Sequence, residues 1–244
     1  YALLRQHPWA IAVWLPAAVA AGLIIARLIR YEPMASGSGI PQVEGMVVHG
    51  LKIKSFSVLA VRFAAGILSS FFGLSLGREG PCIQIGAAGS QAIAKKTSNN
   101  KIEENYLITA GAAAGLSAAF SAPLSGVMFA LEEVHRSFSG LLLITATTAS
   151  LTSDVVATLV FGLTPILSFT QTPQLPASLY FWLLPLGVVS GVFGSLMNKS
   201  LLGFLKLYNK LPEKLRPVTA LLIALLFGLF LPQVLGGGRE LIQS

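Results

Sequence analysis

The segment FAAGILSSFFGLSLGREGP, Phe63–Pro81, joins an uncharged apolar run to a turn that holds two charges, two glycines and a proline. The run at 63–76 is one of several that carry no charge, and the others cover residues 10–26, 106–131, 137–153, 155–198 and 218–238. A helix that crosses a bilayer needs about 20 predominantly apolar residues. Several of these runs are long enough, so the sequence predicts an all-α polytopic membrane protein.

The composition agrees with a chain that faces lipid. Only 11% of the residues are charged and 54% are hydrophobic, with a mean hydropathy of +0.72, whereas about 25% of a soluble domain is charged. The net charge is +7. The basic residues lie between the apolar runs, as is typical of residues that set membrane topology and contact lipid headgroups. We therefore expect a lipid bilayer as partner and no nucleic acid. One cysteine, Cys82, and three separated histidines predict no disulfide and no metal site, and no cofactor is expected.

Apolar periodicity and Gly/Pro breaks give an approximate order of elements. Helices are expected at about 9–29, 42–49, 55–74, 81–95, 107–119, 123–133, 141–161, 179–207 and 218–235. Residues 96–105 are expected to form a solvated loop. A Trp-Leu-Pro16 motif before Gly22 is repeated as Trp-Leu-Leu-Pro185 before Gly191 at the same Pro-to-Gly spacing. We expect a first membrane repeat at 1–163, a linker at 164–178 and the start of a second, inverted repeat at 179–244.

The first of three glycine-rich breaks is Gly37-Ser38-Gly39-Ile40-Pro41. Pro41 suits the first turn of a helix, and the two glycines permit unusual backbone angles. Free N–H groups and a partial positive charge at a helix N-terminus bind anions, and the Ser38 hydroxyl adds a donor. The break is therefore a candidate anion site. The alternative is that Ser38 only caps its own helix.

The second break, Gly77-Arg78-Glu79-Gly80-Pro81, repeats this pattern and adds an ionisable pair within apolar sequence. Charges in membrane segments are costly and mark functional sites by default. A carboxylate at Glu79 would compete with a free anion for the same N–H groups and would lose this attraction when protonated. Glu79 is therefore a candidate gate and proton carrier. Alternatively, an Arg78–Glu79 ion pair only fixes the turn.

The third break, Phe120 to Gly126, starts a helix at Pro123 that ends near Glu132 and Glu133. Glu133 would lie about 15 Å from the start of this helix. Carboxylates serve as proton relays in transporters, so Glu132 and Glu133 are candidates for a proton pathway. Alternatively, two adjacent acids at a helix end mark the water interface.

Three blocks in this order resemble the CLC family of chloride channels and chloride/proton exchangers. They are GSGIPQVEG at 37–45, GREGPCIQIG at 77–86 and GAAAGLSAAFSAPLSGVMFALEE at 111–133. The segments LPLGVVSGVFGSLMNK at 184–199 and GGGRELI at 236–242 also resemble family segments. The resemblance implies a CLC-like inverted-repeat bundle of tilted, partly spanning helices. It also implies a homodimer in which each subunit has its own anion pathway.

By the same resemblance, Ser38 coordinates the central anion, Glu79 is the gating glutamate and Arg78 lies near the outer site. Glu133 matches the inner proton glutamate of the exchangers, and serine at position 38 indicates chloride as the transported ligand. The second anion-binding segment of the family, Gly-x-Phe-x-Pro, and its anion-coordinating tyrosine are absent. We therefore expect a fragment, truncated in the second repeat, that would not transport by itself.

The leading interpretation is a chloride/proton antiporter in the plasma membrane of a bacterium. A passive gated chloride channel and a fluoride transporter remain alternatives. A membrane-embedded enzyme using Glu132 and Glu133 would lack a nucleophile–base set and a metal cluster, so we expect no enzyme. A structural scaffold would leave the three helix breaks without a purpose.

Overall fold

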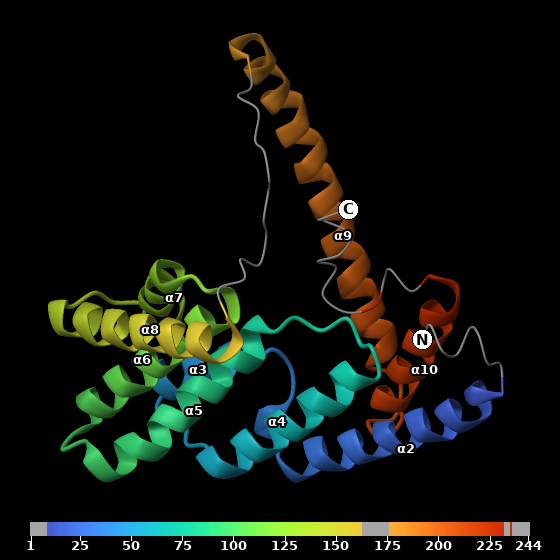
Figure 1. Ribbon diagram of the computed structural model, residues 1–244, viewed down its shortest axis with the longest axis horizontal. Coiled ribbons are helices and arrows are strands. Elements are labelled where there is room, and N and C mark those ends of the chain that lie inside the picture. Colours follow the sequence, from blue (N-terminus) through green and yellow to red (C-terminus); the bar gives the residue numbers. More distant parts are fainter. Residues whose placement is uncertain (1–8, 163–175, 232–234, 236–244) are drawn as a thin grey trace.

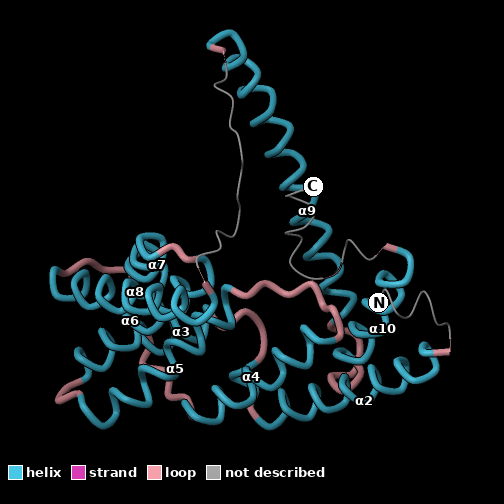
Figure 2. Tube along the Cα trace, viewed as in Figure 1, coloured by secondary structure: helices cyan, strands magenta, loops and turns pink. Residues whose placement is uncertain are grey.

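The computed structural model describes residues 9–162, 176–231 and 235, and every regular element within them is helical (Figures 1 and 2). The first elements in chain order are α2 (Ala10–Tyr31), the 3-10 turn η1 (Pro33–Ala35), α3 (Ile40–Val48), α4 (Ser55–Phe71), α5 (Glu79–Thr97) and α6 (Lys101–Phe120). They are followed by α7 (Pro123–Phe129), the π-helical turn η2 (Ala130–His135), α8 (Gly140–Phe161), the 3-10 turn η3 (Ala177–Trp182), α9 (Leu183–Tyr208) and α10 (Arg216–Phe230). The all-α class expected from the sequence is confirmed.

Most of the predicted helices are present, with boundaries shifted by a few residues. The prediction of a solvated loop at 96–105 is wrong. Helix α6 already begins at Lys101, inside that segment. The Asn100 side chain caps the helix by accepting a hydrogen bond of 2.9 Å from the Glu103 backbone N–H. Its charged first turn therefore belongs to a helix, because the cap satisfies an N–H group that the helix itself leaves unpaired.

Helices α5 and α6 form the most closely packed pair, and their glycines explain how closely the backbones approach. A β-carbon on Gly86 would overlap the Gly111 carbonyl oxygen, and one on Gly115 would overlap the Cys82 carbonyl oxygen. Small residues allow such contact between helices in lipid. This close packing places the start of α5 beside the end of α6.

Three of the described helices are long and apolar enough to cross a membrane: Ile11–Tyr31, Gly140–Phe161 and the segment Ser178–Tyr208. Helices α4 and α10 are shorter and apolar. Helix α9 extends away from the other helices (Figure 1) and has no buried residue. Exposed leucine, valine and phenylalanine side chains of this kind are the expected surface of an integral membrane protein.

Helix α10 packs against α2, at the other end of the sequence (Figure 1). A β-carbon on Gly22 would lie 2.7 Å from the Val218 Cα, so these two backbones touch. Most of the expected linker at 164–178 and the GGGRELI segment lie outside the described residues. The division at 1–163 and 179–244 therefore stays a prediction, although α2 and α10 hold its two parts together.

Candidate functional site

The first break lies between η1 and α3, and its backbone requires glycine. Gly37 has φ 69° and Gly39 has φ 96°, in the left-handed region that residues with a β-carbon rarely adopt. Gly39 is the N-cap of α3, and Ile40 and Pro41 form its first turn. The glycines therefore separate η1 from α3, and the first N–H groups of α3 face the break, as the motif predicts.

The second break needs its glycines for space. Helix α5 begins at Glu79, with Gly80 and Pro81 in its first turn and Arg78 as N-cap. A β-carbon on Gly77 would overlap the Glu79 carboxylate, so this exposed side chain folds back over the turn. The described residues contain no Arg78–Glu79 ion pair, so the alternative reading of this motif has no support in the geometry.

The structure brings these two breaks together. A β-carbon on Gly80 would overlap the Ser38 carbonyl oxygen and lie 2.8 Å from the Ser38 Oγ. A β-carbon on Gly39 would lie 3.0 Å from the Gly80 carbonyl oxygen. The N-termini of α3 and α5 therefore meet, and each contributes a partial positive charge to the same place. The Ser38 hydroxyl lies at this junction.

Arg62 on α4 forms hydrogen bonds to the backbone of the first break. The sequence motifs did not predict this role. The Arg62 Nη1 donates to the carbonyl oxygens of Ala35 at 2.6 Å and Gly37 at 2.8 Å, and its Nη2 donates to the carbonyl oxygen of Ser38. The side chain is buried, with 9% exposed. A single arginine within the apolar helix at 55–71 was the available signal, because a charge there is costly unless it has a function.

Gln84 on α5 was also missed. Its Nε2 donates to the Met34 carbonyl oxygen at 2.7 Å, and the side chain is fully buried. Among the described residues, Gln84 Oε1 and Arg62 Nε have no hydrogen-bond partner. The residues before α3 are thus fixed from two helices. The Arg62 guanidinium, which forms no ion pair within the described residues, lies beside the junction of α3 and α5.

The third break approaches the second through an aromatic contact. Helix α6 ends at Phe120, and the Arg78 guanidinium carbon lies 5.7 Å from the Phe120 ring centroid. Ser121 follows with φ 49°, a left-handed conformation that costs energy for a serine. Pro123 then starts α7, as predicted. All three breaks therefore lie in one region where helices end and begin.

Glu132 and Glu133 do not continue the α-helix that starts at Pro123. They lie on the π-helical turn η2, and both are exposed. π-Helical turns are rare and are frequent at functional sites. Arg136, just after η2, forms an ion pair of 3.0 Å with Glu44 on α3. The segment that carries the two glutamates is therefore attached to the helix whose other end is the first break.

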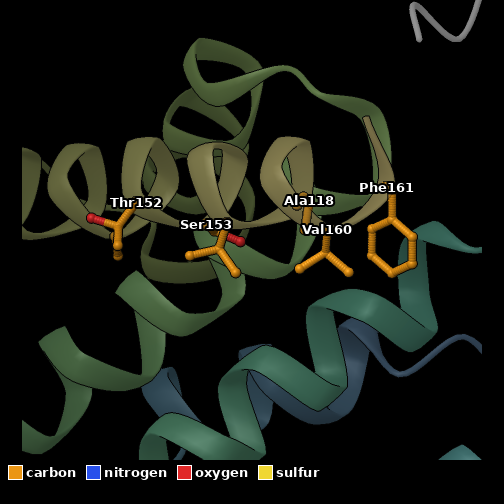
Figure 3. Close-up of a pocket in the computed structure, with 8 residues that line it drawn as sticks. Ala118, Thr152, Ser153, Val160 and Phe161 are labelled. Atoms are coloured by element: carbon orange, nitrogen blue, oxygen red, sulfur yellow. The ribbon is translucent and has the colours of Figure 1, made fainter. Parts of the chain in front are cut away.

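The pocket in Figure 3 is separate from these residues. It has a volume of about 530 Å³, lies between α6 and α8 and is mostly apolar. The labelled lining residues are Ala118, Thr152, Ser153, Val160 and Phe161. None of the three breaks contributes to it, so it is an open groove on the apolar surface and not part of the candidate anion site.

Comparison with known proteins gives consistent results. A family model described as voltage-gated chloride channel matches residues 17–244. The H(+)/Cl(-) exchange transporter ClcA of Vibrio parahaemolyticus is 35% identical over 231 residues, which cover 88% of this chain and 48% of that protein. The ClcA protein of Vibrio vulnificus is 35% identical over 254 residues, which cover 97% of this chain and 52% of that protein. The chain thus spans about half the length of the curated relatives it matches.

Two solved structures are also similar. A slow cyanobacterial Cl-/H+ antiporter aligns with a TM-score of 0.81 and 29% identity, covering 97% of this chain and 58% of that chain. A CLC-type fluoride/proton antiporter aligns with a TM-score of 0.79 and 25% identity, covering 99% of this chain and 61% of that chain. These alignments confirm the expected fold for the length that this chain covers.

Proposed function

Because this chain belongs to the voltage-gated chloride channel family, we propose that it forms part of a transporter that exchanges chloride for protons. The observation that carries the proposal is the contact between Ser38 and Gly80, where the N-termini of α3 and α5 meet. A small anion at this junction would receive backbone N–H groups from two helices and the Ser38 hydroxyl. The relatives named as chloride/proton exchangers support this choice of substrates.

In this proposal Gly37, Ser38, Gly39, Ile40 and Pro41 form one side of the anion site. Gly77, Arg78, Glu79, Gly80 and Pro81 form the other side. Arg62 supplies a fixed positive charge and holds the Ser38 backbone. The positive potential of the site then comes from groups of the protein that are fixed in place. Such a potential favours an anion over a neutral solute.

Glu79 is proposed as the gate and as one proton carrier. Its carboxylate lies over Gly77, at the start of α5, and is exposed. When ionised it competes with the anion for the first N–H groups of α5, and when protonated it no longer does. Anion entry and proton uptake would therefore be linked at one residue, and Glu133 on η2 is proposed as the second proton station.

The test is transport by the full-length protein in liposomes with an outward chloride gradient, with chloride efflux and external pH recorded together. We expect chloride efflux to drive protons against their gradient. Glu79→Gln cannot change its charge, so chloride should move without protons in this variant. Glu213→Gln, at an exposed turn after α9, is the control and should behave as the parent. Proton coupling that persists in Glu79→Gln would refute the gate.

Two alternatives are decided in the same assay. Chloride flux without proton movement in the parent protein would make it a passive channel. Similarity to a fluoride/proton antiporter makes fluoride the second anion to test. Equal gradients of fluoride and chloride would show which anion is transported faster.

We further propose that the protein is a homodimer, as the resemblance to the CLC family implies. We place it in the plasma membrane of a bacterium because the relatives are bacterial. Helix α8 has a large exposed apolar face, which includes Leu141, Ile144 and Leu159, and such a face suits a second copy. Light scattering of the detergent-solubilised protein measures its mass, and a monomer at all concentrations would contradict the proposal.

A further inference from the structure

A small cavity lined by basic side chains lies between the end of α3, the segment before α4, the end of α5 and the start of α6. The candidate anion site lies at the opposite ends of α3 and α5. The cavity has a volume of about 240 Å³, and its polar lining consists of Lys52, Lys95, Lys101, Gln91 and Glu104. Drug-sized ligands occupy pockets of about 300–1,000 Å³. This cavity is smaller than that range and suits a single compact polar group.

The charges in the cavity favour an anion. Three ammonium groups face one carboxylate, that of Glu104, which pairs with Lys101 at 3.1 Å. Lys52 has no ion pair or hydrogen bond within the described residues. Helix α6 begins at Lys101, so the positive end of its dipole lies at the same place.

Gln91 shows that the cavity is more than a set of surface lysines. Its side chain is 4% exposed, and its Oε1 accepts a hydrogen bond of 2.6 Å from the Ser55 hydroxyl. Gln91 lines the cavity, and its Nε2 forms no hydrogen bond within the described residues. A side-chain amide nitrogen carries two N–H donors, which are available here to an acceptor in the cavity.

Lys95 is positioned by the surrounding backbone. Its Nζ donates to the Ile53 carbonyl oxygen at 3.2 Å and to the Ser55 Oγ at 3.4 Å. An ammonium group has three donors, so one donor is left for a ligand. A ligand that bound Lys52, Lys95 and Gln91 would therefore connect the start of α4 with the end of α5.

The cavity lies at the boundary between apolar and polar sequence. The apolar helix α4 begins directly after Lys54. Helix α5 ends at Thr97, before the polar segment Ser98–Asn100. Basic pockets between membrane helices at this level bind the headgroups of anionic lipids. We propose that this cavity binds the phosphate group of an anionic phospholipid, a function independent of the proposed transport.

The test compares lysines that line the cavity with neighbours that do not. Lys52→Gln/Lys95→Gln removes two lining charges, and Lys54→Gln/Lys96→Gln removes two charges beside them. The purified full-length protein in neutral detergent is titrated with phosphatidylglycerol, and bound lipid is counted by native mass spectrometry. Phosphatidylcholine and inorganic phosphate are titrated in parallel.

We expect the cavity variant to bind phosphatidylglycerol about 25-fold more weakly, since each lysine near a membrane surface contributes about fivefold. The Lys54/Lys96 control should bind as the parent does, and phosphatidylcholine should bind weakly to all three. Equal losses in both double variants, or a loss in neither, would overturn the proposal. Displacement of the lipid by inorganic phosphate at equal concentration would show that the ligand is soluble phosphate and would overturn the assignment to lipid.

The hydrogen bonds of Lys95 could make the double variant unstable. The single exchange Lys52→Gln removes a side chain that bonds to nothing in the described structure, so the fold does not depend on it. It should weaken phosphatidylglycerol binding about fivefold, while Lys54→Gln should have no effect. Identical affinities for these two single variants would also refute the site.

Discussion

The carbonyl oxygen of Ser38 occupies the space that a β-carbon on Gly80 would need. Two helices that begin about 40 residues apart in the sequence therefore start against each other, because position 80 carries no side chain. This contact explains why the second glycine of the GREGP motif is required even though its φ is not in the left-handed region. It also makes the junction sensitive to very small changes in volume.

Gly80→Ala is the direct test of this contact. The added methyl group would force the Ser38 loop away from α5, at a cost of about 1–3 kcal/mol for overpacking. We expect a lower unfolding temperature and a large loss of chloride efflux from liposomes. Gly89→Ala, later in α5, is the matched control, because its β-carbon would meet no atom within 4 Å. If Gly80→Ala transports like this control, the junction is not the anion site.

Arg62 should matter for both stability and anion binding. Arg62→Met leaves three backbone carbonyl groups without their donor, and each unsatisfied buried group costs about 1–3 kcal/mol. Arg62→Lys keeps the charge but not the fork of donors, so it should lie between Arg62→Met and the parent.

Thermal unfolding in detergent and chloride binding by calorimetry measure the effects of these Arg62 variants. Arg27→Met, at an exposed position of α2, should leave both values unchanged. Chloride affinity equal to that of the parent in Arg62→Met would show that this arginine only supports the fold.

The two glutamates of η2 should differ in function although both are exposed. Glu133→Gln is expected to abolish proton movement in liposomes while chloride efflux continues, because glutamine cannot carry a proton between the two sides. Glu132→Gln has the same change of charge one residue earlier and should keep coupled transport. Proton movement that survives in Glu133→Gln, or is lost equally in both, would contradict the role proposed for Glu133.

Asn100→Ala tests the helix start that the sequence did not predict. The variant removes the side-chain acceptor for the Glu103 N–H, and the loss of such a cap costs about 1 kcal/mol. We expect a small decrease in the unfolding temperature without an effect on chloride transport. Asn99→Ala, which loses only a side-chain contact of 3.5 Å to Glu103, should be nearly neutral.

Local patterns were sufficient for the helices and the three breaks. Apolar runs located α2, α4 and α8. The Gly/Pro motifs located the starts of α3 and α5 to within about two residues and the start of α7 at Pro123. These features depend on residues close in the chain. The charges of the segment 96–105 suggest a loop, whereas Asn100 and Glu103 have the spacing of a helix-capping pair.

Long-range contacts were beyond such patterns. The roles of Arg62 and Gln84 depend on carbonyl groups 24 to 50 residues earlier in the chain, and backbone carbonyls have no signature in a sequence. The π-helical geometry at Glu133 also has no local pattern in the sequence, and η2 packs against α3 and α6, which are distant in the chain or lie before it. Whether Glu79 and Glu133 carry protons stays a prediction.

The packing of α10 on α2 has a consequence for biosynthesis. Val218 is made roughly 200 residues after Gly22, the residue it touches, which is about 10–40 s at ~5–20 residues per second. During this time the inner face of α2 must be covered by lipid, by the translocation machinery or by other helices. A ribosome that stalls between α8 and α10 would therefore leave a nascent chain whose first helix lacks its partner, and protease accessibility of α2 in such stalled chains should fall once α10 emerges.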